Sequence, residues 1–192
     1  MQKTNVTRNR WIPLPLLFAG CLCACSEDNT TVAEATPAAA TIEYTCGRGG
    51  SLKTTMFGAI SAEIDWNATE VACEGMPRPR GEGARLRFAG TLVEADQAIA
   101  IIIGLPDLEP GATGKELVTN ATLILEGNGR FFSTAVEAAC WTDVTRQEPL
   151  NENRYAISGN MYCIAPLAEV NGDSSVIIEE LRFSGLLDWD SK

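Results

Sequence analysis

The chain contains no histidine among its 192 residues, and this absence removes whole classes of chemistry. Without imidazole, neither a Ser-His-Asp nor a Cys-His catalytic arrangement can form, and zinc sites that need histidine are impossible. Catalysis by carboxylates stays open, since the chain has 25 acidic residues. We identify no metal site and expect no cofactor.

Basic residues are scarce once the N-terminal segment is set aside. Lys3, Arg8 and Arg10 are the basic residues of positions 1–25, which contain no acid. The remainder therefore carries 12 basic against 25 acidic residues, a net charge of −13. Such a charge repels the phosphates of nucleic acids, so we expect no nucleic-acid partner. It favours solubility and permits attraction to cationic partners.

No apolar run is long enough to predict a membrane-spanning helix. The uncharged segment 11–24 is shorter than the roughly 20 apolar residues that a span requires, and it is interrupted by Pro13 and Pro15. A basic start, a short apolar segment and small residues at its end are typical of a secretory signal peptide. The sequence therefore predicts export.

The end of this segment resembles the lipobox of bacterial lipoproteins, in which a Leu-like residue and two small residues precede the lipidated cysteine. Two frames fit: LCAC, which ends at Cys25, and FAGC, which ends at Cys21. We favour Cys25, because a charged tract begins at Ser26 directly after it, and we keep Cys21 as the alternative. The resemblance implies a signal peptide over 1–24, a lipidated (palmitate-bearing) flexible tether over 25–41, and anchoring in the cell envelope at the outer membrane.

Four cysteines remain after the signal segment: Cys46, Cys73, Cys140 and Cys163. An even count in an exported chain indicates two disulfides, for which three connectivities are possible. We predict the sequential pairs Cys46–Cys73 and Cys140–Cys163. Each pair closes a short loop, and the loop-entropy model assigns each about 3.5 kcal/mol of stabilisation.

Residues 42–192 are predicted to form a single β domain. Apolar and polar residues alternate over 85–92, 97–105 is a strongly apolar strand, and a Gly-Asn-Gly sequence at 127–129 predicts a hairpin. The weakly patterned segment 67–75 predicts at most one short helix. Short strands separated by Gly and Pro favour a mainly β fold, an antiparallel sandwich or barrel, stapled by disulfides.

Two acids flank a tryptophan near the end of the chain, in Asp188-Trp189-Asp190. Carboxylates two residues apart on a strand share a face at about 6–7 Å, within reach of a two-carboxylate glycosidase. A solvated strand end beside a core tryptophan explains the same pattern, and we prefer that interpretation. We keep a carboxylate-dependent glycan hydrolase as an alternative function.

Two short stretches resemble the periplasmic lysozyme-inhibitor lipoproteins. The sequence YTC ending at Cys46 is similar to that family's opening strand, and SGNMY, from Ser158 to Tyr162, matches its Ser-Gly-x-x-Tyr motif. The resemblance covers only these stretches, which lie farther apart than in that compact family. It implies that Ser158 and Tyr162 would enter the cleft of a cationic lysozyme-type enzyme, a second alternative function.

The sequence as a whole predicts a non-enzymatic, lipid-anchored envelope protein whose β domain binds or scaffolds. Its expected partners are the membrane, through the lipid, and an envelope protein or glycan that the sequence does not identify. The residues singled out for binding are Ser158, Tyr162, Asp188, Trp189 and Asp190.

Overall fold

The structure is a computed structural model that describes residues 46, 49–79, 82–136 and 139–190. The predicted signal peptide and tether, with Cys21 and Cys25, lie outside these residues. The described part contains twelve strands and a short 3-10 helix, η2 (Val93–Ala95), and none of its helices is long and apolar enough to cross a membrane. The strands are β1 (Ser51–Gly58), β2 (Ala62–Trp66), β3 (Ala72–Pro77), β4 (Ala84–Leu92), β5 (Gln97–Leu105), β6 (Gly114–Leu125), β7 (Arg130–Ser133), β8 (Cys140–Pro149), β9 (Arg154–Cys163), β10 (Leu167–Glu169), β11 (Ser175–Ile178) and β12 (Leu181–Asp188).

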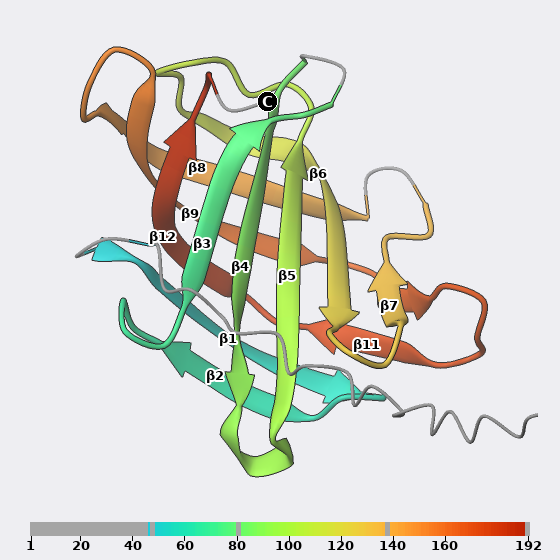
Figure 1. Cartoon of the computed structure of the whole chain (residues 1–192). Helices are drawn as coiled ribbons and strands as arrows, with labels where there is room; N and C mark the ends of the chain where they lie inside the picture. Colours follow the sequence, from blue (N-terminus) through green and yellow to red (C-terminus); the bar gives the residue numbers. More distant parts are fainter. Residues whose placement is uncertain (1–45, 47–48, 80–81, 137–138, 191–192) are drawn as a thin grey trace, which may run out of the picture. The chain divides into compact units, whose positions relative to one another are not determined.

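All pairings between the described strands are antiparallel, and neighbouring short strands act together as longer ones. β7 and β8 follow each other along one edge of β6, where Ser133 pairs with Thr122 and Cys140 with Thr119. β10 and β9 pair with these two strands, and β11 and β12 pair in turn with β10 and β9. β1 lies along both β11 and β12 and carries β2 on its other side. The result is one meandering sheet with β2 and β3 at its edges (Figure 1).

The sheet curls because its two edge strands are consecutive in the chain. Residues 67–71 are the whole connection between β2 and β3, and a segment of that length reaches at most about 18 Å. β3 also lies directly against β12, since a Cβ at Gly75 would collide with the carbonyl oxygen of Leu186. The mainly β, antiparallel prediction is confirmed, in the form of a single sheet curled around its core.

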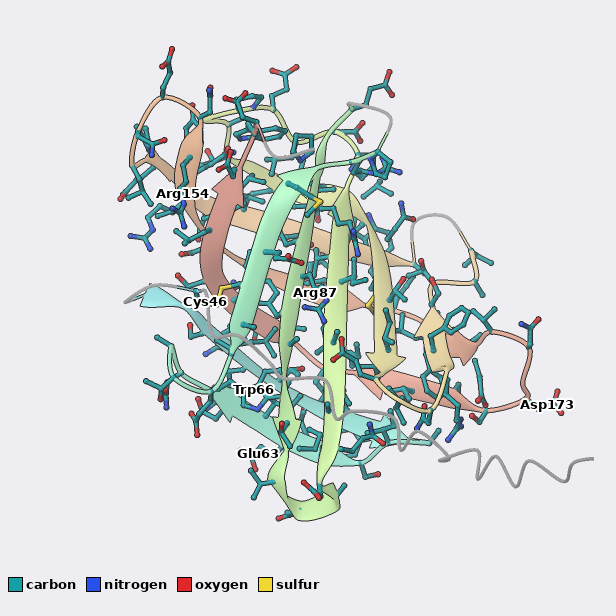
Figure 2. The ribbon with its side chains drawn as sticks, viewed as in Figure 1. Cys46, Glu63, Trp66, Arg87, Arg154 and Asp173 are labelled. Carbon is teal, nitrogen blue, oxygen red and sulfur yellow. A yellow bond between two sulfur atoms is a disulfide. The ribbon has the colours of Figure 1, made fainter. Side chains whose placement is uncertain are left out.

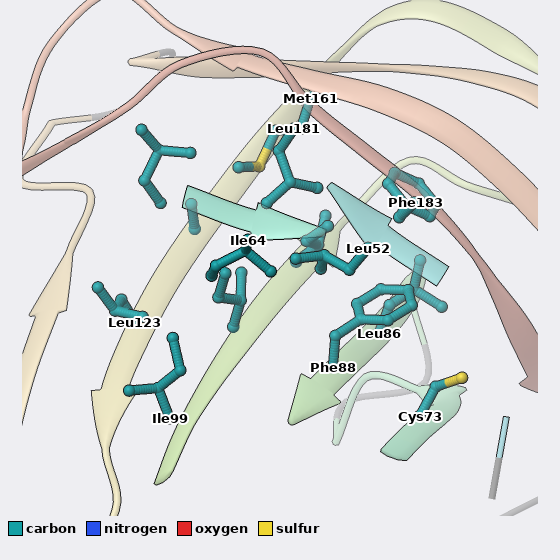
Figure 3. Packing of buried hydrophobic residues seen from close by; sticks show 14 of the residues in the cluster. Leu52, Ile64, Cys73, Leu86, Phe88, Ile99, Leu123, Met161, Leu181 and Phe183 are labelled. Carbon is teal, nitrogen blue, oxygen red and sulfur yellow. The ribbon is translucent and has the colours of Figure 1, made fainter. Parts of the chain in front are cut away.

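The core is apolar and is built from both halves of the curled sheet (Figure 3). Phe88 of β4 packs against Phe183 of β12 with ring centroids 5.6 Å apart. Burying a large apolar side chain contributes about 1.5–3 kcal/mol, so the inward alternation of β4 and β12 is a main source of stability. Fully buried aliphatic residues around this pair include Leu52, Ile64, Leu86, Ile99, Ile101, Ile103 and Leu123.

The outer face of β4–β6 carries small residues beneath an ion pair. Arg87 on β4 bonds to Glu126, beyond β6, so its side chain crosses over β5 (Figure 2). Ala89 and Ala100 pair across β4 and β5 and are fully buried although they face outward. Small side chains at these positions leave room for the arginine to lie flat along the sheet.

Both predicted disulfides, Cys46–Cys73 and Cys140–Cys163, are present. The second joins directly paired residues of β8 and β9, and the first fastens the start of the described domain to β3. The two bonds span 27 and 23 residues, so the loop-entropy value of about 3.5 kcal/mol for each applies.

The predicted hairpin is also present, between β6 and β7. Gly127 and Gly129 have φ values of 89° and 71°, a region that glycine enters without a steric penalty, and Asn128 Oδ1 accepts the backbone N–H of Arg130 at 3.0 Å. The prediction of a short helix within 67–75 was wrong. That segment is a turn followed by β3, because pairing with β4 and the disulfide of Cys73 hold it extended.

Candidate functional site

A groove with a volume of about 850 Å³ lies beside β2. Its walls are β2 with the end of β1 on one side, and the end of β4 with η2 on the other, and Gln97 and Leu125 complete the lining. Trp66 and Glu63, both on β2, mark its position next to the β4–β5 hairpin (Figure 2). We call this feature the β2 groove.

The floor of the β2 groove is apolar. Trp66, Leu92 and Leu125 belong to the core but keep 7%, 8% and 7% of their surface accessible, while Met56 beside them is fully buried. The groove is thus the place where the core reaches the surface, and an apolar ligand group could cover these three side chains there.

Glycine at position 90 sets the position of the Trp66 ring. A Cβ at Gly90 would lie 2.6 Å from Cε2 of Trp66, so the indole packs directly on the backbone of β4. Within the part of the chain that the structure describes, no residue accepts a hydrogen bond from the indole N–H of Trp66, and this atom is not among buried polar atoms without a partner. The N–H therefore keeps some accessible surface and is not used by a described residue, so it can donate to a ligand.

The rim of the groove is acidic. Asp65 forms an ion pair with Lys53 at 2.6 Å, and Glu70 accepts the backbone N–H of Asn67 at 3.1 Å. None of the described residues that line the groove is basic, although Lys53 lies beside the rim in its ion pair with Asp65.

Two of the rim acids form no direct ion pair. Glu63 on β2 and Glu94 in η2 have no ion pair or hydrogen bond with any described residue. They line the groove from opposite walls, so a cation that enters meets negative charge on both sides, although Lys53 already interacts electrostatically with Glu63.

Apolar side chains also stand exposed at the rim. Val93, in η2, is 89% exposed, and Phe57, at the end of β1, is 45% exposed. Isolated exposed apolar residues are common on protein surfaces, but these two adjoin a floor that is itself apolar. The combined surface is suited to a ligand that has apolar and cationic parts.

Ser158, one of the predicted binding residues, lies on the outer face of β9 and not in the groove. Its Oγ accepts a hydrogen bond from Nη2 of Arg146 at 3.1 Å and lies 3.0 Å from Oγ of Ser184. The serine is half-buried in the middle of a strand, so these neighbours use its hydroxyl within the sheet.

Tyr162 lies on the same face of β9, four residues further along. Its ring stacks on Trp141 of β8 with centroids 5.9 Å apart. Burial, followed by the charges of Glu116 and Asp143, raises the pKa of Tyr162. The phenol is therefore neutral at physiological pH and forms part of a half-buried aromatic pair.

The three residues at 188–190 form a strand end and a turn. β12 ends at Asp188, so Asp188 and Asp190 do not share a strand face as the sequence suggested. Asp188 Oδ1 accepts the backbone N–H of Asp190 at 3.0 Å, and the side chain of Asn153 donates to Asp190. The indole N–H of Trp189 donates to Oε1 of Gln147 at 3.0 Å, and the ring packs on the core.

Sequence reasoning missed the β2 groove entirely. The sequence from Ile60 to Trp66 does alternate apolar and polar residues, and this signal could have located the strand. It could not have located the groove, because the opposite wall comes from η2, about 30 residues later.

No protein family, curated protein or solved structure matches the chain. Within the described ranges, no group of three or more acidic or cysteine side chains is placed to hold a metal ion. The β2 groove is therefore the feature of the described residues that best indicates a function.

Proposed function

We propose that this protein is a non-enzymatic binding protein of the cell envelope, anchored by lipid on Cys25, and that the β2 groove is its ligand site. One observation carries the proposal: the groove combines an apolar floor with an acidic rim, and no basic residue is among the described residues that line it. Ligand sites of proteins are typically concave, mostly apolar, and about 300–1,000 Å³ in volume.

The tether would give the domain reach. A flexible linker of the length of 26–41, which the composition of that segment predicts, would hold its ends roughly 20 Å apart on average. An acidic domain held at this distance from a membrane can meet cationic partners in the envelope without leaving the surface.

Site-specific photo-cross-linking in intact cells tests the proposal. A photoreactive amino acid replaces Val93, which is 89% exposed on the rim, and in a second strain replaces Ile164, which is 75% exposed and does not line the groove. We expect discrete adducts from position 93 that position 164 does not form. Equal adducts at both positions, or none at position 93, would refute the groove as the ligand site.

A further inference from the structure

We propose that the β2 groove binds an extended segment of another polypeptide in which basic and apolar residues alternate, and that this segment adds as a strand to the free edge of β2. The inference rests on the proposed function and names the chemistry of the partner. It follows from where the groove meets β2, from the pairing of that strand, and from the side chains on its two faces.

The groove runs along the edge of β2 and not over one of its faces. Successive side chains of a strand point to opposite faces, so a hollow above one face would be lined by alternate residues only. This groove is lined by Ala62 and Trp66, which face inward, and also by Glu63 and Asp65, which face outward. Contact with both sets places the hollow beside the backbone of the strand.

That edge of β2 has no partner among the described residues. All five residues of β2 pair with β1 on one side, from Met56 opposite Ala62 to Leu52 opposite Trp66. No described strand pairs on the other side, although residues 67–71 carry the chain onward to β3. An open strand edge presents N–H and C=O groups in the register that an added strand requires, and peptide recognition by strand addition uses such edges.

The two faces of β2 define the side chains of the added strand. Residues directly opposite each other in an antiparallel pair interact, and opposite charges or two apolar groups stabilise the pair. Inward positions of the added strand would meet Trp66 and the apolar floor, whereas outward positions would meet Glu63 and Asp65, the second of which is already paired with Lys53. Glu94 supplies further negative charge from the opposite wall. The matching segment alternates apolar and basic residues.

A second copy of this chain does not fit the same edge. Pairing one β2 with another would bring Glu63 of each copy close to the acids of the other β2, and like charges across a strand pair are destabilising. The complementary charge has to come from a different polypeptide.

The test measures fluorescence anisotropy with the full chain and a short labelled peptide in which lysine and valine alternate. Comparison peptides replace lysine by glutamate, or carry N-methyl groups on alternate backbone amides, which removes their hydrogen-bond donors. The protein variant is Glu63→Gln with Glu94→Gln. The matched control is Asp107→Asn with Glu152→Gln, which makes the same change in net charge at exposed positions outside the groove.

We expect saturable binding of the lysine–valine peptide. Binding should be about tenfold weaker in the groove variant, which removes two charge contacts, and nearly unchanged in the control. The glutamate peptide should not bind, and the N-methylated peptide should bind at least about tenfold more weakly. No saturable binding, equal loss in both double variants, or full binding of the N-methylated peptide would overturn strand addition. The proposal would also be overturned if the chain self-associates and this self-association prevents the peptide from binding. None of these results would remove adducts formed at Val93, so failure of this inference is distinguishable from failure of the proposed function.

Discussion

Gln147 is the buried polar side chain on which one end of the domain depends. It lies in β8, and its amide makes four hydrogen bonds. Oε1 accepts the backbone N–H of Gly111 at 2.9 Å and the indole N–H of Trp189 at 3.0 Å. Nε2 donates to the carbonyl oxygens of Glu109 and Ala112 at 3.0 and 2.6 Å. One side chain therefore fastens the β5–β6 loop to the end of β12.

Replacing this residue by leucine keeps its approximate volume and removes all four hydrogen bonds. A neutral hydrogen bond contributes about 1 kcal/mol net, which sets an upper value of about 4 kcal/mol. Glu109 and Gly111 are exposed, so water can replace part of what is lost at these positions. Trp189 and Ala112 are half-buried, so water replaces a smaller part of the hydrogen bonding lost at the indole N–H and at the carbonyl oxygen. We expect Gln147→Leu to lower the free energy of unfolding by about 2–3 kcal/mol.

Urea denaturation followed by tryptophan fluorescence measures this change, and a red shift of native emission should report wetting of Trp189. Gln97→Leu is the matched control. The amide of Gln97 donates to the carbonyl oxygens of Ala98 and Glu126, and its oxygen accepts a third, longer hydrogen bond from Asn128 at 3.4 Å, at an exposed position where water can replace it. The loss of stability in Gln97→Leu should be about half as large, roughly 1 kcal/mol. If Gln147→Leu lowers the free energy of unfolding by no more than Gln97→Leu does, the four hydrogen bonds of Gln147 do not stabilise this end of the domain, and the prediction is refuted.

Two further predictions concern an ion pair and the anchor. Hydrogen bonds from Arg130 and from the Ser174 hydroxyl lower the pKa of Glu169 to about 2, below its unfolded value of about 4.3. The stability that ionised Glu169 contributes is therefore present above about pH 4.3 and is lost as the pH falls toward 2. The melting temperature should therefore fall more steeply over this range in the wild type than in Glu169→Gln, and parallel curves would contradict the assignment. Cys25→Ser should abolish palmitate labelling and membrane retention, while Cys21→Ser should preserve both. Loss of the label only in Cys21→Ser would show that Cys21 is the lipidated residue. An unlabelled wild-type protein would refute the lipoprotein proposal.

The parts of the fold that could be predicted are those whose pattern is local. β5 begins and ends at the residues expected, Gln97 and Leu105, because a strongly apolar run bounded by turn residues is interpretable without knowledge of its neighbours. The hairpin at 127–129 was predictable for the same reason, since its glycines are required by the backbone of the turn itself.

β3 could not be predicted because its stability is not local. The sequence of Ala72–Pro77 contains Gly75 and ends in proline, both of which are unfavourable in strands. The segment is extended because β4 pairs along all of it and Cys73 is bonded to Cys46. Gly75, which weakens the local signal, is the residue that allows β3 to approach β12.

Two tryptophans show that local sequence is also insufficient to locate the candidate site. Trp189 attracted attention because acids flank it, but Trp66 also follows an acid, Asp65, and local sequence does not separate the two. Their indole N–H groups do separate them. That of Trp189 is bound to Gln147, 42 residues away, whereas that of Trp66, a residue that lines the groove, has no acceptor among the described residues. A tryptophan whose hydrogen bond is satisfied within the fold stabilises the fold, and one whose donor faces an apolar hollow is available to a ligand. The distinction is made by a residue distant in sequence, so only the folded chain reveals which tryptophan belongs to a binding site.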